Sequence, residues 1–302
     1  MNKHSLQQFG ALSLLIGGLS LSACSNEEIH MDDARVALQV TSGIQTRAYD
    51  ATWEANDEIG IFGFTQGDAP AQAYTNVRYV TTGGNGRFTP DGTTIYLPTD
   101  GSSLDFVAYY PHTTDLENGI YTVDVENQSD QSTIDLMAAS KLSANRSKNT
   151  VAFNFEHKLS KIVFNFTAGV GMDESELAGM KVQLTNQQTL ATFNVTQPDG
   201  EVVVGTNTPA TLTLNTDADG TSSEGIVLPS ANFDGMTLHL ELSDGSSFFN
   251  WDLNNSQNAD KFEAGKKYVY DITVNRSGLG VTATITDWTP GNGENGEQVD
   301  AY

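Results

Sequence analysis

Cysteine and basic residues are scarce in this chain of 302 residues, and each scarcity excludes a class of protein. The single cysteine, Cys24, excludes a disulfide framework and a cysteine-based zinc site within the chain. Only 15 lysines and arginines stand against 38 aspartates and glutamates, which gives a net charge of −23 at pH 7. Such an acidic chain lacks the broad basic surface with which proteins bind a phosphate backbone. We therefore expect no nucleic-acid partner.

Strand and turn formers dominate what is present. Hydrophobic residues make up 38% of the chain and aromatic residues 9%, which is enough for packed cores and too much for a disordered chain. Threonine, asparagine, aspartate and 28 glycines favour strands and turns over helices. At about 100–200 residues per domain, the length suggests two domains. The composition favours an all-β protein.

The N-terminus has the pattern of an export signal. Lys3 precedes a short apolar run over residues 11–20, and small residues lead up to Cys24. The run is shorter than the roughly 20 residues that span a bilayer. Leu21-Ser22-Ala23-Cys24 resembles a bacterial lipobox, in which the cysteine becomes lipidated, for example with palmitate. We predict a signal peptide over residues 1–23 and a surface-exposed lipoprotein anchored to the cell outer membrane through Cys24; the alternative is an ordinary signal peptide with an accidental cysteine.

Alternating apolar residues predict strands from residue 36 onward. Val36, Leu38 and Val40 share one face, the period of a half-buried strand; Ser42-Gly43 should break it, and residues 44–50 should form a polar loop. Residues 172–180 predict a short helix, and the glycines at 83–86 predict a hairpin turn more readily than a phosphate cradle. Further strands are expected at 58–64, 76–80, 94–97, 104–111, 151–155, 162–166, 238–242 and 268–274.

The strand pattern is interrupted by a polar connector over residues 141–149. We place a domain boundary at its end, which gives an N-terminal β-sandwich over 48–149 and a C-terminal β-sandwich with a tail over 150–302. Each sandwich should be antiparallel, with about seven strands. Residues 24–47 would precede them as a propeptide.

Several motifs, in the same order along the chain, carry a family resemblance. They are Thr46-Arg47-Ala48 with Trp53 and residues 57–62, then 106–111, 135–137, 153–162, 262–270 and Asp287-Trp288. Together they resemble the fimbrillin family (Mfa-like), the subunits of type V pili. Asn56 stands where the family usually has glycine, and asparagine also tolerates a left-handed backbone.

The resemblance implies an architecture and a maturation route. The fold would be two tandem transthyretin-like β-sandwiches in a lipoprotein precursor. Arg47-Ala48 resembles the site cut by Arg-directed proteases, and Arg35 is a poorer site because it adjoins the strand itself. Cleavage after Arg47 would free the first strand, which carries Val36, Leu38 and Val40. The alternative is that Arg47 is only an exposed loop residue and the strand stays in place.

The same resemblance implies assembly into a surface fimbrium (pilus) that supports cell adhesion. The vacated groove would accept a strand from another subunit, most plausibly near Val281, Ala283 and Ile285, by donor-strand exchange. The expected partners are other fimbrial subunits, either copies of this chain or accessory subunits, and a host or bacterial surface ligand. The alternative is a surface lipoprotein that binds a glycan or host ligand and does not polymerise.

Signals for catalysis and metals are weak. Residues 215–220 begin like a calcium loop, but Ile226 occupies the position of the bidentate glutamate, so a hairpin loop is the better interpretation. The pairs Asp217/Asp219 and Glu174/Glu176 say nothing about the spatial separation that a glycosidase requires. We predict that the protein is not an enzyme and has no cofactor, metal or catalytic residue.

Two further residue types leave alternatives open. His157 lies at a strand end, where packing or a hydrogen bond is more plausible than a metal ligand. Trp53, Trp251 and Trp288 could form a sugar-binding platform, although isolated tryptophans in a sandwich more often pack in the core.

Overall fold

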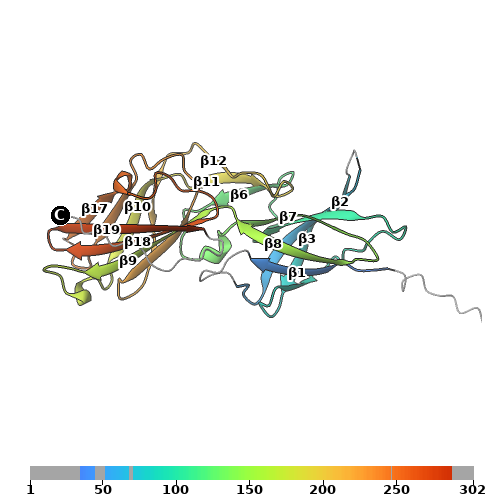
Figure 1. Cartoon of the computed structure of the whole chain (residues 1–302), viewed down its shortest axis with the longest axis horizontal. Helices are drawn as coiled ribbons and strands as arrows, with labels where there is room; N and C mark the ends of the chain where they lie inside the picture. Colours follow the sequence, from blue (N-terminus) through green and yellow to red (C-terminus); the bar gives the residue numbers. More distant parts are fainter. Residues whose placement is uncertain (1–34, 45–51, 68–70, 246, 288–302) are drawn as a thin grey trace, which may run out of the picture. The chain divides into compact units, whose positions relative to one another are not determined.

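Within the residues that the structure describes, the regular structure is almost entirely β-strand (Figure 1). The computed structural model describes residues 35–44, 52–67, 71–245 and 247–287. Helix in this part of the chain is limited to the 3₁₀ turns η2 (Gln131–Thr133), η3 (Glu174–Glu176) and η4 (Leu253–Asn255). No helix within these residues is long and apolar enough to cross a membrane. The all-β prediction is confirmed.

The first group of strands closes on itself. Their order around the ring is β1-β4-β3-β2-β5-β7-β8. Their bounds are β1 (Gln39–Ile44), β2 (Asp57–Thr65), β3 (Gln72–Thr81), β4 (Arg87–Pro90), β5 (Leu104–Tyr110), β7 (Met137–Ala144) and β8 (Thr150–His157). All neighbours in the ring are antiparallel except β1 and β8, which run parallel and close it.

The remaining strands form three sheets. A four-stranded sheet has the order β13-β10-β16-β17, with β13 (Ala210–Thr213), β10 (Lys181–Gln187), β16 (Thr237–Glu241) and β17 (Phe248–Asp252). A five-stranded sheet has the order β14-β15-β9-β18-β19, with β14 (Asn215–Thr216), β15 (Ser222–Val227), β9 (Ser160–Ala168), β18 (Lys266–Asn275) and β19 (Gly278–Asp287). A three-stranded sheet has the order β12-β11-β6, with β12 (Val203–Val204), β11 (Leu190–Asn194) and β6 (Ile120–Asp124).

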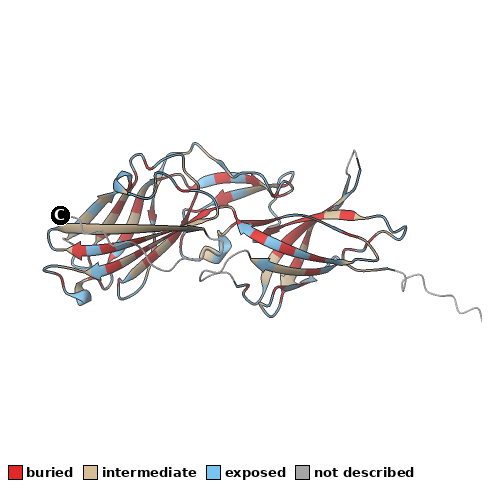
Figure 2. Ribbon diagram, viewed as in Figure 1, coloured by how far each residue is buried: buried red, intermediate tan, exposed pale blue. Residues whose placement is uncertain are grey.

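Alternation along the strands sorts side chains between core and solvent, as Figure 2 shows by colour. In β8 the pattern is strict: Val151, Phe153 and Phe155 are buried, whereas the residues between them are exposed. Successive side chains of a strand point to opposite faces, so one apolar stripe fills one core.

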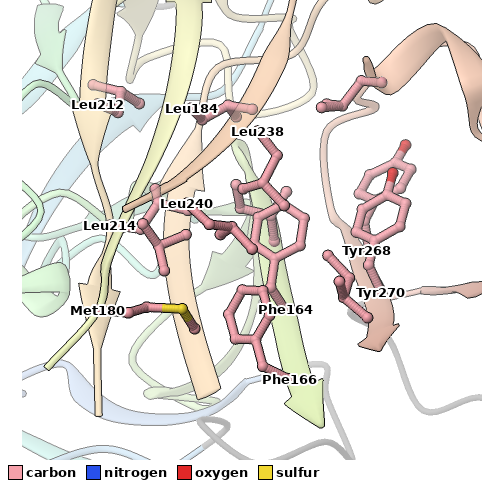
Figure 3. Packing of buried hydrophobic residues seen from close by; sticks show 14 of the residues in the cluster. Phe164, Phe166, Met180, Leu184, Leu212, Leu214, Leu238, Leu240, Tyr268 and Tyr270 are labelled. Atoms are coloured by element: carbon pink, nitrogen blue, oxygen red, sulfur yellow. The ribbon is translucent and has the colours of Figure 1, made fainter. Parts of the chain in front are cut away.

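Three hydrophobic clusters result from this sorting. One fills the strand ring and includes Ile59, Phe106 and Phe153. A second lies between the four-stranded and five-stranded sheets, where the Phe164 and Tyr270 rings stack 5.3 Å apart (Figure 3). The third joins residues of the ring, such as Phe62 and Tyr109, to β11, β15 and their neighbours. Burying such aromatic side chains is a main source of stability in a fold of this kind.

The helix expected over residues 172–180 is a single turn. Asp173 and Glu176 form a capping box that starts it, since the Asp173 amide donates to the Glu176 carboxylate at 2.8 Å. Gly179 then adopts a φ of +72° and the chain enters β10 at Lys181, so the helix has no room to extend.

The polar stretch over residues 141–149 is not a connector between sheets, because its first residues belong to β7, which runs to Ala144, and the rest form a tight turn within the ring. Asn145 and Lys148 exchange backbone hydrogen bonds of 3.1 and 3.0 Å, and this turn joins β7 to β8. The strand Thr150–His157, which we assigned to the C-terminal sandwich, therefore pairs within the first ring. The five-stranded sheet begins with β9 at Ser160. The division into two sandwich domains stays a prediction.

Candidate assembly site

The first described strand, β1, lies between two neighbours. Along one edge it runs parallel to β8, with Gln39 opposite Thr150 and Ile44 opposite Phe155. Along the other edge, Val40 pairs with Phe88 of β4. Figure 1 shows β1 beside β8 in the ring. A segment near the N-terminus thus provides the strand that closes the ring of pairings.

The residues just before β1 are also held by backbone hydrogen bonds. The Leu38 amide donates to the Ile95 carbonyl and the Leu97 amide to the Val36 carbonyl, both at 2.9 Å. The Asn149 side chain donates to the Ala37 carbonyl at 3.0 Å. The segment from Val36 to Ile44 therefore lies in a groove whose walls offer hydrogen-bond donors and acceptors along its whole length.

The predicted apolar face of this segment is present. Leu38 is 4% exposed and Val40 is 3% exposed, and Val36 and Ile44 pack partly buried against the same cluster. The strand extends further at its C-terminal end than we expected. It continues through Ser42 and Gly43, where we expected a break, because the Ser42 amide donates to the Gly86 carbonyl at 2.7 Å and pairing with β8 runs on to Ile44.

An aromatic cluster lies next to the groove. The Trp53 ring meets the rings of Phe88, Tyr110 and Phe155 edge-on, with centroids 5.0–5.3 Å apart. Trp53 is buried and so offers no face to a sugar, and Trp251 packs against the second cluster. Trp288 lies outside the described residues. For Trp53 and Trp251, core packing is the correct interpretation.

The Asp57 carboxylate is hydrogen-bonded to a member of this aromatic cluster. The Tyr110 hydroxyl donates to the Asp57 carboxylate at 3.1 Å, and the Glu54 amide donates to it at 2.6 Å. Burial raises the pKa of the Asp57 carboxyl, and burial together with the nearby Asp57 charge raises the pKa of the Tyr110 phenol. These bonds fix the start of β2 beside Trp53.

The glycine cluster at residues 83–86 is the turn between β3 and β4, as predicted. Gly84 and Gly86 have φ values of +60° and +72°. A Cβ on Gly86 would lie 2.2 Å from the Ser42 carbonyl oxygen, and one on Gly84 would lie 2.5 Å from the Trp53 carbonyl oxygen. Glycine is needed at both positions because the turn presses against the end of β1 and against Trp53.

The predicted processing residues are outside the described structure. Cys24, Arg47 and Ala48 all fall within the segments that the structure leaves out, 1–34 and 45–51. Their roles stay predictions, and so does the displacement of the strand carrying Val36, Leu38 and Val40.

The other candidate residues serve local structure. His157 Nδ1 lies 2.8 Å from the Asp135 carboxylate at the end of β8, the hydrogen-bonding role expected for it. Asp219 accepts the Thr221 amide in the loop between β14 and β15, and this bond lowers the pKa of its carboxyl. Glu176 pairs with Arg276 at 2.6 Å. The described residues contain no cluster of three or more His, Cys, Asp or Glu side chains placed to hold a metal.

The part of the site that sequence reasoning missed is the strand that pairs with one edge of β1, namely β8. The stripe of Val151, Phe153 and Phe155 was recognised as a strand, but its place beside Gln39–Ile44 was not. The shortness of the turn before Thr150 could have placed β8 in the same sheet as β7, since a tight hairpin keeps two strands in one sheet, but it carries no signal for the pairing with β1.

Comparisons with known proteins identify the family of the chain. The fimbrillin-like family profile matches residues 46–288. A candidate fimbrium subunit of Bacteroides uniformis, Fim1C, is 44% identical over 292 residues, which cover 92% of this chain and 94% of that protein.

Solved structures give the same result. The crystal structure of a candidate cell adhesion protein from Bacteroides uniformis has a TM-score of 0.77 at 42% identity, covering 85% of this chain and 99% of that one. A second one, from Bacteroides ovatus, has a TM-score of 0.67 at 22% identity, covers 84% of this chain and 98% of that one, and shows the shared fold. The chain therefore belongs to the fimbrillin-like family, which consists of structural subunits and not of enzymes.

Proposed function

We propose that this protein is a fimbrial subunit that is exported as a lipoprotein, cut after Arg47 and assembled by donor-strand exchange. The observation that carries the proposal is the seating of β1. This strand lies near the N-terminus, is paired along both edges and buries Leu38 and Val40, yet it is joined to β2 through the segment that contains Arg47. One cut in that segment would separate the strand covalently from the rest of the ring.

The energetics favour replacement over an empty groove. Fully burying an aliphatic side chain stabilises a fold by about 1.5–3 kcal/mol, so Leu38 and Val40 together contribute about 3–6 kcal/mol. Loss of the strand would also leave backbone groups of β4, β8 and residues 95–97 unpaired. An exposed apolar groove with unpaired backbone groups favours the binding of an incoming strand.

The relatives support the cellular role. The 44% identical relative is named as a candidate fimbrium subunit, and the similar crystal structure is of a candidate cell adhesion protein. By extension, this chain acts at the cell surface within a fimbrium, partnered by other fimbrial subunits, and contributes to adhesion. Cys24 would hold the precursor in the outer membrane through its lipid.

One observation favours the second candidate, a surface lipoprotein that binds a ligand without polymerising. A cleft of about 700 Å³ opens beside the end of β8, between residues 156–158, 200–202, 229–230 and 261–266. Lys158 on its wall is half-buried over the Phe193 ring, and burial lowers its pKa. The two candidates differ in whether cutting leads to polymers.

Protease treatment distinguishes them. Wild type, Arg47→Ala and Arg35→Ala are treated with an Arg-specific protease and examined for SDS-resistant ladders. We expect ladders from wild type and from the Arg35→Ala control, and none from Arg47→Ala. Equal polymerisation of all three, or none from fully cut wild type, would contradict assembly by this route.

A further inference from the structure

Strand β17 is an edge strand that carries an exposed aromatic residue. It lies at the end of the four-stranded sheet, and among the described strands it pairs only with β16. Phe248 is 51% exposed, and Asn250 and Asp252 on the same face are exposed as well. Phe249 and Trp251 point the other way and pack against the second cluster. An edge of this kind can pair with another chain, because its outer backbone groups have no strand beside them.

The hydrogen bonds to β16 show which backbone groups of β17 face outward. Directly after β17, the Leu253 amide donates to the Met236 carbonyl at 3.0 Å. Because bonding alternates along an antiparallel pair, the odd-numbered residues of β17 bond to β16. The backbone groups of Phe248, Asn250 and Asp252 therefore face away from β16, and they have no backbone partner within the part of the chain that the structure describes.

Several other sheet edges of this chain are blunted. β12 and β14, which end the three-stranded and five-stranded sheets, are only two residues long. Pro209 directly precedes β13, at the opposite edge of the four-stranded sheet. Short edge strands, prolines and lysines keep sheet edges from pairing with other chains. β17 has five residues and contains neither proline nor lysine, so its edge stays open to pairing.

We propose that β17 pairs with β17 of a second copy of this chain, antiparallel and about a two-fold axis at Asn250. Asn250 then lies opposite Asn250 of the second copy, and Phe248 lies opposite Asp252 of the second copy. The contact joins two four-stranded sheets into one continuous sheet. It uses neither the groove of β1 nor cleavage after Arg47, so it goes beyond the proposed function, and its failure would leave that function untouched.

Hydrogen bonding and charge select this register. It pairs all three outward-facing residues of each copy, whereas a shift by two residues leaves one of them outside the ladder. The two Asp252 carboxylates are then about 14 Å apart, beyond the screening length of roughly 8–10 Å at physiological salt. A register with Asp252 opposite Asp252 would place like charges face to face, which is destabilising.

Two contacts order the exposed side chains before pairing. The His239 and Phe248 rings stack with their centroids 5.7 Å apart. His239 Nδ1 lies 2.7 Å from the Asn250 side-chain oxygen. Side chains that are already ordered lose less conformational entropy when they are covered by a partner. The two contacts therefore favour pairing along this edge.

The proposed contact is isologous, so it closes after two copies and does not extend a filament. Between assembled subunits it would link neighbouring filaments side by side. Each copy carries a net charge of −23 at pH 7, so two copies repel each other over long range. Salt screens this repulsion, and we expect the pairing to strengthen as the salt concentration rises.

Disulfide trapping tests the register on the uncut chain. With Cys24→Ser throughout, the introduced cysteines are the only thiols. Asn250→Cys should form a disulfide-linked dimer with itself, because directly opposed residues have Cα atoms about 5.5 Å apart, within disulfide range. Phe248→Cys should be trapped when it is mixed with Asp252→Cys. Neither of these two variants should form a dimer alone, since identical positions are then about 14 Å apart.

We expect at least about tenfold more dimer from Asn250→Cys, and from the mixture of Phe248→Cys with Asp252→Cys, than from Phe248→Cys or Asp252→Cys alone. No dimer from Asn250→Cys, or equal amounts of dimer from all of these samples, would overturn the proposal.

Sedimentation at high salt, without introduced cysteines, gives a second measurement. Asn250→Lys would place two ammonium groups opposite each other at the axis, and we expect it to weaken dimer formation at least about tenfold. Gln183→Lys is the matched control, because it adds the same charge to β10, an interior strand of the same sheet, and should dimerise like the parent chain. Equal dimer formation by Asn250→Lys and the parent, or a parent that stays monomeric at every concentration, would contradict pairing through β17.

Discussion

At the scale of single residues, the seating of β1 depends on a few buried side chains. Leu38 enters the ring cluster at 4% exposure, while Gln39 beside it faces solvent. Truncating Leu38 to alanine leaves a cavity that the ring fills only in part. We expect Leu38→Ala to lower the free energy of unfolding of uncut protein by about 2–5 kcal/mol in denaturant titrations. Gln39→Ala should change it by less than about 0.5 kcal/mol, and an equal effect of the two would contradict the burial of this face.

Gly86 is required by conformation and by space. Gly86→Ala would combine a φ of +72° with a Cβ 2.2 Å from the Ser42 carbonyl oxygen. We expect a loss of about 1–3 kcal/mol in thermal or chemical unfolding, since strained left-handed residues cost about this much. Gly43→Ala is the matched control: the added methyl meets nothing within 4 Å, so it should be neutral or stabilising. Similar losses for both would argue against contact between this turn and β1.

Buried phenols make the fold sensitive to alkali. Burial raises the pKa of Tyr109 and of Tyr121 to about 12, from 10.0 in a free side chain. The unfolded chain releases these protons first, so their contribution to stability is complete below pH 10 and is lost as the pH rises through about 12. Unfolding followed from pH 9 to 12 should show this loss, and Tyr121→Phe should reduce it. A pH-independent stability over that range would contradict the burial of these hydroxyls.

At the scale of elements, local patterns were predictable and their pairing was not. The alternation of Val151, Phe153 and Phe155 identifies β8 as a strand, because the period of a half-buried strand is visible within a few residues. Its parallel pairing with β1, some 110 residues earlier, leaves no local trace, so the boundary at residue 149 fell inside the ring. The polar residues before residue 150 were interpreted as a connector between domains, whereas Asn145 and Lys148 close a tight turn between β7 and β8.

The pairing of β1 indicates which backbone amides should lose protection from hydrogen exchange after cleavage. If β1 leaves, backbone amides of β4, β8 and residues 95–97 that face it lose their partners, whereas β9 and β18 keep theirs. Hydrogen exchange should therefore accelerate in the first set and stay unchanged in the second. Unchanged exchange in β8 after complete cutting would show that the strand remains seated.

At the scale of the whole molecule, the family was accessible from sequence because motifs spread along the chain keep their order. The all-β class was accessible from composition and from the alternation along the strands. Lipid anchoring through Cys24, as proposed, would act on the whole protein. We expect Cys24→Ser to be released from the membrane fraction or left unprocessed, since Cys24 is the single cysteine of the chain. Retention of Cys24→Ser in the membrane with normal maturation would contradict lipidation at this residue.

Strand replacement is tested most directly by the composition of the assembled polymer. SDS-resistant polymers are isolated after Arg-specific cleavage, dissociated by heat, and examined by intact-mass spectrometry and N-terminal sequencing. We predict subunits that begin at Ala48 and polymers that contain no peptide with Leu38 and Val40. Polymers that retain residues 38–44 in amounts equal to the subunit would contradict the replacement of the first strand.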